Sequence, residues 1–154
     1  MFKRILVPVD GSRTSNLGLD KAIGLAREHS AALYLLHVID ERVAMQGLWG
    51  GSASAIDRLF DSLRDNGKRV LARAEARARG KRIHVKAVLA ENVARSVADV
   101  IVSHARQWRA DVIVIGTHGR RGISRLVMGS DAEGVVRTTH VPVLLVRGKR
   151  TDPR

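Results

Sequence analysis

Short apolar segments alternate with longer amphipathic segments along the whole chain. The apolar segments cover residues 5–9, 32–38, 83–89, 110–115 and 141–146. Near-continuous runs of β-branched and aliphatic residues are typical of strands that are covered on both faces, and an alternating run such as 83–89 is typical of a strand covered on one. We therefore predict five strands.

Between these strands, apolar residues recur at the three- and four-residue spacing of a helix. The first such stripe, which follows a possible cap at Ser12 or Ser15, consists of Leu19, Ala22, Ile23 and Ala26. Further helices are predicted over residues 56–78, 92–108 and 132–138. The Asn-Gly pair at residues 66–67 can kink or split the second helix.

The regular alternation of strand and helix predicts an α/β fold, with a five-stranded, mainly parallel, doubly wound sheet and helices on both faces. We find no linker or change of composition that divides residues 1–147, and residues 148–154 form a polar tail. Ligands of such sheets bind beyond the carboxyl ends of the strands, where the strand order reverses. The loops after the first and fourth strands are therefore expected to meet at a binding site.

Composition narrows the classes of function. The 154 residues include no cysteine, which excludes disulfides, thiol catalysis and Cys-based metal sites and is compatible with a reducing compartment. The apolar run at residues 5–9 is too short for the core of a signal peptide, and no run approaches the ~20 residues of a membrane helix. We expect a cytoplasmic protein with no membrane partner.

Basic residues exceed acidic residues, which gives a formal net charge of +12. A domain this basic attracts polyanions, so nucleic acid remains a possible partner. The densest basic stretch, residues 64–86, is interleaved with alanines at helical spacing. That pattern favours a solvated helix face over a nucleic-acid surface.

A glycine-rich segment follows the fourth predicted strand and runs from Gly116 to Ser130. Glycine allows backbone amides to approach a phosphate closely, and the helix predicted just after Gly129 and Ser130 would direct its positive end toward an anion. The segment has neither the GxGxxG pattern nor a P-loop lysine. Backbone and hydroxyl groups, helped by Arg120 or Arg121, would therefore hold phosphates, and fast phosphoryl transfer is not expected.

This segment resembles the nucleotide-binding signature of the universal stress protein family. The shared pattern is G-x2-G-x9-G-[ST] after an apolar strand that Ala-Asp precedes. The first strand and turn, ILVPVDGS, the second-strand ending LLHV and the closing VPVLLV are also similar to that family. The resemblance spans residues 1–147 and implies a Rossmann-like fold of the adenine nucleotide alpha hydrolase type.

The resemblance also implies a site for ATP, ADP or AMP, with Mg²⁺ bridged by the phosphates of ATP. Pro8, Val9 and Asp10 would line the adenosine, with the Asp10 carboxylate on a ribose hydroxyl. The Val38 backbone would contact adenine. The residues implied for the ribose and phosphates are Gly116, Gly119, Gly129 and Ser130, with Thr117, His118, Arg120, Arg121, Gly122 and Asp131 nearby.

Asp131 is unusual at its position, because a carboxylate favours the helix N-terminus but repels a phosphate. Either it helps hold the metal, or the site prefers fewer phosphates. Asp10 can alternatively cap the first helix, and residues 47–51 can form a lid or a flexible connection. We interpret His37 as structural, and His118 has no Ser or Asp partner at catalytic spacing, so no catalytic residue is assigned.

The implied function is a nucleotide-binding stress-response module or switch with little or no turnover. The alternatives are a slow ATPase or other phosphoryl-transfer enzyme, a basic nucleic-acid-associated factor and a ligand-free dimeric scaffold. Members of the family commonly dimerise through their last strands. The predicted strand from Val141 to Val146 would otherwise leave an apolar edge exposed, so we expect a homodimer.

Overall fold

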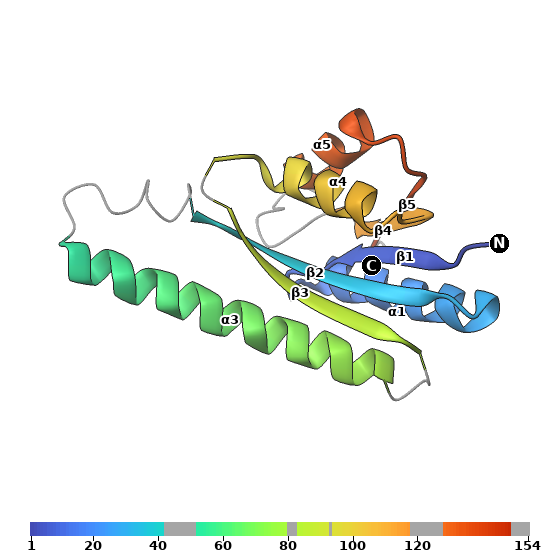
Figure 1. The fold of residues 1–154 in the computed structure, drawn as a ribbon, viewed down its shortest axis with the longest axis horizontal. Helices are drawn as coiled ribbons and strands as arrows, with labels where there is room; N and C mark the ends of the chain where they lie inside the picture. The colour runs from blue at the N-terminus through green and yellow to red at the C-terminus, as the bar shows by residue number, and fades with distance from the viewer. Residues whose placement is uncertain (42–51, 80–82, 93, 118–127, 149–154) are drawn as a thin grey trace, which may run out of the picture.

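The computed structural model describes residues 1–41, 52–79, 83–92, 94–117 and 128–148. In this part of the chain, five parallel strands form one sheet in the order β3-β2-β1-β4-β5 (Figure 1). The strands are β1 (Arg4–Pro8), β2 (Ala32–Asp40), β3 (Val85–Asn92), β4 (Val112–Gly116) and β5 (Val143–Val146). The predicted doubly wound α/β fold is confirmed, and the sheet is parallel throughout.

Helices cover both faces of the sheet (Figure 1). They are α1 (Arg13–His29), α3 (Ala53–Arg79), α4 (Val97–Gln107) and α5 (Ser130–Thr138). Because successive strand residues point to opposite faces, Ile5 and Val7 of β1 pack with α1 and α3, whereas Leu6 packs with α4 and α5. None of the helices in these described ranges has the length and hydrophobicity of a bilayer-spanning helix.

The predicted apolar stripe of the first helix is buried in the core on the α1 side of the sheet. Ser12, rather than Ser15, caps this helix, because its side chain accepts a hydrogen bond from the Ser15 amide at 3.2 Å. Ser15 is itself buried in the helix.

The prediction that residues 66–67 kink or split the second helix is wrong, because α3 runs unbroken through Gly67. A Cβ atom on Gly67 would lie 2.6 Å from Cδ1 of Leu89 and 2.8 Å from Cδ2 of His37. Glycine at this position therefore allows α3 to pack closely against β2 and β3.

The predicted helix over residues 92–108 begins later, at Val97, because Ser96 and Asp99 form a capping box. The Ser96 hydroxyl accepts from the Asp99 amide at 3.1 Å, and the Asp99 carboxylate accepts from the Ser96 amide at 3.2 Å. The first residue of the predicted helix, Asn92, instead belongs to β3, because β2 and β3 remain paired as far as Asp40 and Asn92. Both strands thus extend beyond their predicted ends.

The last two strands are shorter than predicted at their starts. β4 begins after Asp111, whose Oδ2 accepts hydrogen bonds from the amides of Lys3 at 2.7 Å and Arg4 at 2.8 Å. β5 begins at Val143, directly after Pro142, which has no amide to donate to a strand ladder.

Candidate functional site

A pocket of about 320 Å³ opens at the carboxyl ends of β1, β2 and β4, with α3, α4 and α5 forming its walls. Its size is within the range of small-molecule sites. It lies at the point where the strand order reverses, with β2 and β3 on one side of β1 and β4 and β5 on the other. The described residues that directly follow β1 and β4, such as Asp10 and Thr117, therefore lie together where the topology predicts.

Every predicted site residue within the described ranges lines this pocket. These residues are Pro8, Val9, Asp10, Val38, Gly116, Thr117, Gly129, Ser130 and Asp131. His118, Gly119, Arg120, Arg121 and Gly122 lie outside the described residues, as does the suggested lid at residues 47–51. The structure thus brings together the two ends of the glycine-rich segment and the ends of β1 and β2.

Asp10 is held at the rim of the pocket by the turn that follows β1. The Val9 amide still donates to the carbonyl oxygen of Leu36 at 2.8 Å, and the chain then turns at Gly11, whose φ is 80°. The Asp10 amide donates to the Ser15 hydroxyl at 3.1 Å, and its Oδ1 accepts from the Ser12 amide at 2.8 Å. Asp10 therefore shapes the turn before α1, while Ser12 caps the helix.

The backbone of Val38 presents a donor and an acceptor to the pocket. The Leu36 carbonyl bonds to β1, and the amide and carbonyl of every second residue in a strand point to the same edge. The amide and carbonyl of Val38 therefore also point toward the β1 side of β2. The pairing of β1 with β2 ends at Pro8 and Leu36, so Val38 lies beyond the last paired residues of these two strands. The other edge of β2 remains paired with β3 as far as Asp40.

Backbone contacts draw the ends of the glycine-rich segment together. The Gly129 amide donates to the Thr117 carbonyl at 2.7 Å, and the Thr117 amide donates to the Val146 carbonyl at 2.9 Å. A Cβ atom on Gly116 would lie 2.8 Å from the backbone carbonyl of Thr14, so glycine is required for the approach of α1 to β4.

The N-terminus of α5 faces the same pocket through its first residues, Ser130, Asp131 and Ala132. Gly129 occupies the N-cap position and supplies no side-chain hydrogen bond to the helix. The first amides of a helix have no intrahelical acceptor and carry the positive end of its dipole. This end of the pocket is therefore suited to an anionic group.

The two ends of the pocket differ in character. The end of β2 and α3 contribute apolar side chains that include Leu36 and Leu63, and Val97 and Ile101 of α4, a helix that packs against α5, add to the apolar lining. The end of β4 and the start of α5 contribute glycines and hydroxyls. Such a pocket can hold a flat apolar ring at one end and an anion at the other.

The charged side chains in the described lining are those of Asp10, Asp40 and Asp131, and no Lys or Arg is among them. No group of three or more His, Asp or Glu side chains within the described ranges is arranged to hold a metal ion. The described part of the site therefore offers carboxylates, hydroxyls and backbone groups for hydrogen bonding.

Sequence reasoning missed part of this lining. Asp40 lies beyond the predicted end of its strand, and the longer β2 brings it to the pocket. Leu63 and Asn66 belong to a helix whose rotation about its axis is set by tertiary packing. His37 also lines the pocket, and its Nδ1 atom lies 2.7 Å from the Val9 carbonyl oxygen, which agrees with a structural role.

Known proteins resemble this chain over almost its full length. The sequence model described as the universal stress protein family matches residues 1–147. Universal stress protein MJ0531 of Methanocaldococcus jannaschii is 33% identical over 99% of this chain and 86% of its own length. The structure of hypothetical protein MJ0577 from the same organism superposes with a TM-score of 0.84, at 26% identity, and covers 98% of this chain and 99% of its own.

Several solved proteins with this fold carry adenine nucleotides. The universal stress protein of Archaeoglobus fulgidus in complex with dAMP has a TM-score of 0.68 and 22% identity, covering 95% of this chain and 98% of its own. Two further proteins of the same fold, 22% and 17% identical to this chain, were solved with cAMP and with AMP. The sequence match over residues 1–147 and the 33% identity to a curated relative place this chain in the universal stress protein family.

Proposed function

We propose that this protein binds an adenine nucleotide, ATP or one of its lower phosphates, and acts as a nucleotide-dependent stress-response switch with little or no turnover. One observation carries the proposal: the backbone donor and acceptor of Val38 and the N-terminus of α5 open into a single pocket. The dAMP, AMP and cAMP complexes of proteins with the same fold support this ligand class.

In this proposal the base occupies the apolar end of the pocket. Adenine has a hydrogen-bond acceptor, N1, beside a donor, its N6 amino group, and these groups complement the amide and carbonyl of Val38. Pro8 and Val9 line the adenosine, and the Asp10 carboxylate accepts a hydrogen bond from a ribose hydroxyl. The contacts of Asp10 with Ser12 and Ser15 hold it ready for this role.

The phosphates point toward α5 and the glycine-rich segment. Gly116, Gly129 and Ser130 supply close backbone approach, helix amides and a hydroxyl, as anion sites at helix N-termini do. Thr117 lines the pocket next to Gly116. We assign the remaining phosphate contacts to His118, Gly119, Arg120, Arg121 and Gly122. With ATP, Mg²⁺ would be held chiefly by the phosphates, near Asp131, and would neutralise part of their charge.

We infer binding rather than rapid turnover from the sequence of the glycine-rich segment. Fast phosphoryl transfer depends on groups such as a P-loop lysine and a placed catalytic base. Residues 116–130 contain no lysine, and no residue of the site is assigned as a base. Slow hydrolysis of ATP remains the alternative, and phosphate release by the purified protein measures it directly.

We also propose that two copies associate through β5. This strand lies at the edge of the sheet beside β4, and Leu144 and Leu145 are 40% and 38% exposed. Antiparallel pairing of β5 with its counterpart would satisfy the edge and cover these side chains. Light scattering that gives the mass of a monomer at all concentrations would exclude this arrangement.

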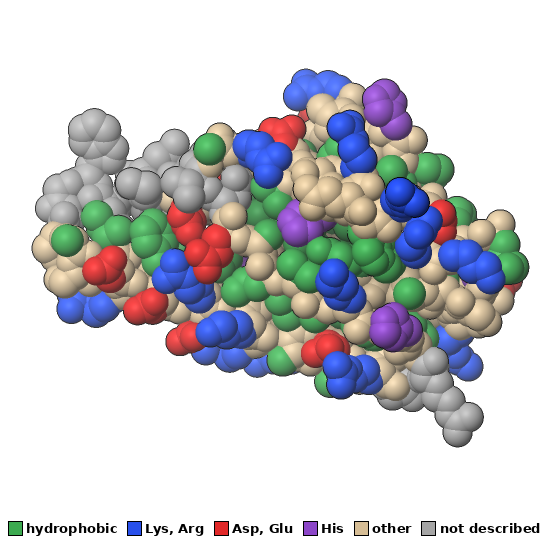
Figure 2. Space-filling model, viewed as in Figure 1, with side chains coloured by type: hydrophobic (Ala, Val, Ile, Leu, Met, Phe, Trp, Pro, Cys, Tyr) green, Lys and Arg blue, Asp and Glu red, His purple; other side chains and the backbone are tan. Residues whose placement is uncertain are grey.

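The net positive charge of the chain does not lead us to propose nucleic acid as its main ligand. Figure 2 shows Lys and Arg side chains interspersed with Asp and Glu side chains on the face in view. On α3, Arg77 and Arg79 bridge to Asp20 and Glu75 at 2.7 Å in each case. These contacts favour a solvated face of α3 over a nucleic-acid surface. As a separate part of the proposal, we place the protein in the cytoplasm, where adenine nucleotides are abundant.

Calorimetric titration with ATP, ADP and AMP, with and without Mg²⁺, tests the proposal. We expect saturable binding that weakens about tenfold in Asp10→Asn, because a hydrogen bond to a charged group is lost. Asp57→Asn, an exposed change on α3, is the matched control and should bind as the parent protein does. Absence of heat with all three nucleotides at millimolar concentration would contradict the proposal.

A further inference from the structure

One wall of the pocket comes from α3, which presents Leu63 and Asn66 one helical turn apart. Asn66 is half-buried, and it introduces a carboxamide on the α3 side of a pocket whose lining also includes the apolar residues Leu36, Val97 and Ile101. Among the residues that the structure describes, none forms a hydrogen bond with this carboxamide. Its donor and acceptor are therefore available to a ligand.

The neighbouring glycine determines how close Asn66 lies to the strands. A Cβ atom on Gly67 would approach Leu89 Cδ1 to 2.6 Å and His37 Cδ2 to 2.8 Å, so α3 rests directly on β2 and β3 here. One turn later, Val70 Cγ2 would lie 3.2 Å from a Cβ atom on Gly11, in the turn after β1. The helix α3 thus passes close to the carboxyl ends of β1 and β2, which line the pocket beside Val38.

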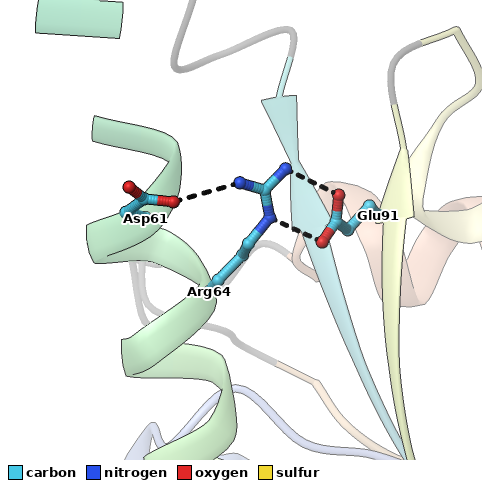
Figure 3. A network of polar contacts seen from close by, with 3 residues as sticks. All are labelled: Asp61, Arg64 and Glu91. Carbon is cyan, nitrogen blue, oxygen red and sulfur yellow. Dashed lines mark hydrogen bonds and ion pairs between the residues drawn. The ribbon is translucent and has the colours of Figure 1, made fainter. Parts of the chain in front are cut away.

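An ion-pair network holds this part of α3 against β3 (Figure 3). The Arg64 guanidinium donates to Oε1 of Glu91 at 2.7 Å and to Oε2 at 3.0 Å, and it also reaches Asp61 at 3.3 Å. Hydrogen bonding from Arg64 is the main cause that lowers the pKa of Glu91. This two-point contact links α3 to β3 two residues before Asn66.

We propose that Asn66 is a specificity-determining residue of the nucleotide site, and that its carboxamide hydrogen-bonds the N6 and N7 edge of adenine. The inference rests on the proposed function, in which the Val38 backbone takes N1 and one hydrogen of the N6 amino group. The second amino hydrogen and the N7 acceptor then remain. A carboxamide matches this pair because it offers one acceptor and one donor side by side, as Asn does toward adenine in DNA.

Replacement of N7 by carbon in the ligand and of Asn66 by Leu in the protein tests this contact from both sides. We expect the parent protein to bind ATP about tenfold more tightly than 7-deaza-ATP, because the analogue leaves the Asn66 amide without an acceptor. Asn66→Leu should weaken ATP binding about tenfold and bind the two ligands equally. Gln107→Leu, which removes an exposed carboxamide at the end of α4, should behave as the parent protein.

A second variant shows whether the effect of Asn66→Leu comes from the lost hydrogen bonds or from a general disturbance of the pocket. Asn66→Asp keeps the shape of the side chain but presents only acceptors to N7, so it should prefer 7-deaza-ATP to ATP. If both variants retain the preference of the parent protein for ATP, or if that protein binds the two ligands equally, the role of Asn66 is overturned while nucleotide binding stands. If the parent protein binds neither ligand, the proposed function itself fails.

Discussion

The Nδ1 atom of His37 lies 2.7 Å from the carbonyl oxygen of Val9, where β1 gives way to Asp10. A carbonyl oxygen only accepts hydrogen bonds, so Nδ1 carries a proton and donates it. His37 is only 6% exposed, and this bond ties β2 to the residue directly before the rim carboxylate. The histidine thus helps to position one edge of the pocket without being a catalytic group.

Replacement of His37 by Ala should lower the free energy of unfolding by about 2–4 kcal/mol, because it leaves a buried carbonyl unpaired and opens a cavity. Urea unfolding followed by circular dichroism measures the change. His140→Ala removes an exposed imidazole and should change the stability by less than about 0.5 kcal/mol. Equal stabilities of the two variants would show that the bond to Val9 contributes nothing.

Two helical glycines allow a test of the close packing of α3. Gly67→Ala should destabilise the protein by about 1–3 kcal/mol, because its Cβ would lie 2.8 Å from Cδ2 of His37, whose ring is held by the bond to Val9. Gly24→Ala on α1 meets nothing within 4 Å and should stabilise by about 0.5–1 kcal/mol through helix propensity. Thermal unfolding of both variants decides the matter, and stabilisation by Gly67→Ala would contradict the packing.

Much of the site was predictable because parallel sheets bind ligands at a topological switch point. The apolar runs located β1 and β4, and the residues that follow them, such as Asp10 and Thr117, then had to lie near one another. Glycine spacing added Gly129 and Ser130, which lie at the start of α5. These inferences need only the order of elements along the chain.

The α3 wall was not predictable in the same way. Several apolar residues of α3 have the same helical spacing, and only packing against His37 and Leu89 selects the face that meets the strand ends. Leu63 and Asn66 reach the pocket for that reason. By contrast, the start of α4 could have been predicted more accurately, since Ser96 and Asp99 have the spacing of a capping box.

His104 should make the protein less stable in mild acid. Its Nδ1 lies 2.8 Å from the Tyr34 hydroxyl, and burial, followed by the charges of Arg95 and Lys86, lowers its pKa below the usual 6.5. The unfolded chain therefore binds a proton at a higher pH than the folded chain does. This contribution to stability is complete above pH ~6.5 and decreases as the pH falls toward the folded-state pKa of His104.

Urea unfolding between pH 7.5 and 5 should show this decrease in the parent protein and a shallower one in His104→Gln. Tyr34→Phe offers a further comparison, because it removes the hydroxyl but leaves the ring that buries His104. Since burial is the first cause of the shift, the pKa of His104 should stay below its usual value in that variant. A proton-NMR titration that places the pKa of His104 above 6.5 in the parent protein would contradict the argument.

Asp131 should set how many phosphates the site accepts. It lines the pocket in the first turn of α5, and the other charged side chains of the described lining, Asp10 and Asp40, are also acidic. A carboxylate beside the phosphates repels a triphosphate more than a monophosphate. In a buffer with EDTA, Asp131→Asn should therefore bind ATP about fivefold more tightly, and AMP should gain less.

The matched control for this change is Glu133→Gln. Glu133 also belongs to the acidic first turn of α5 but is not part of the pocket lining. Both variants should lose about 0.3–1 kcal/mol of stability, because each removes a negative charge near the positive end of the helix. Only Asp131→Asn should change the ratio of the dissociation constants for ATP and AMP. If it instead weakens ATP binding in the presence of Mg²⁺ and leaves that ratio unchanged in EDTA, Asp131 is a metal ligand and does not select against phosphates.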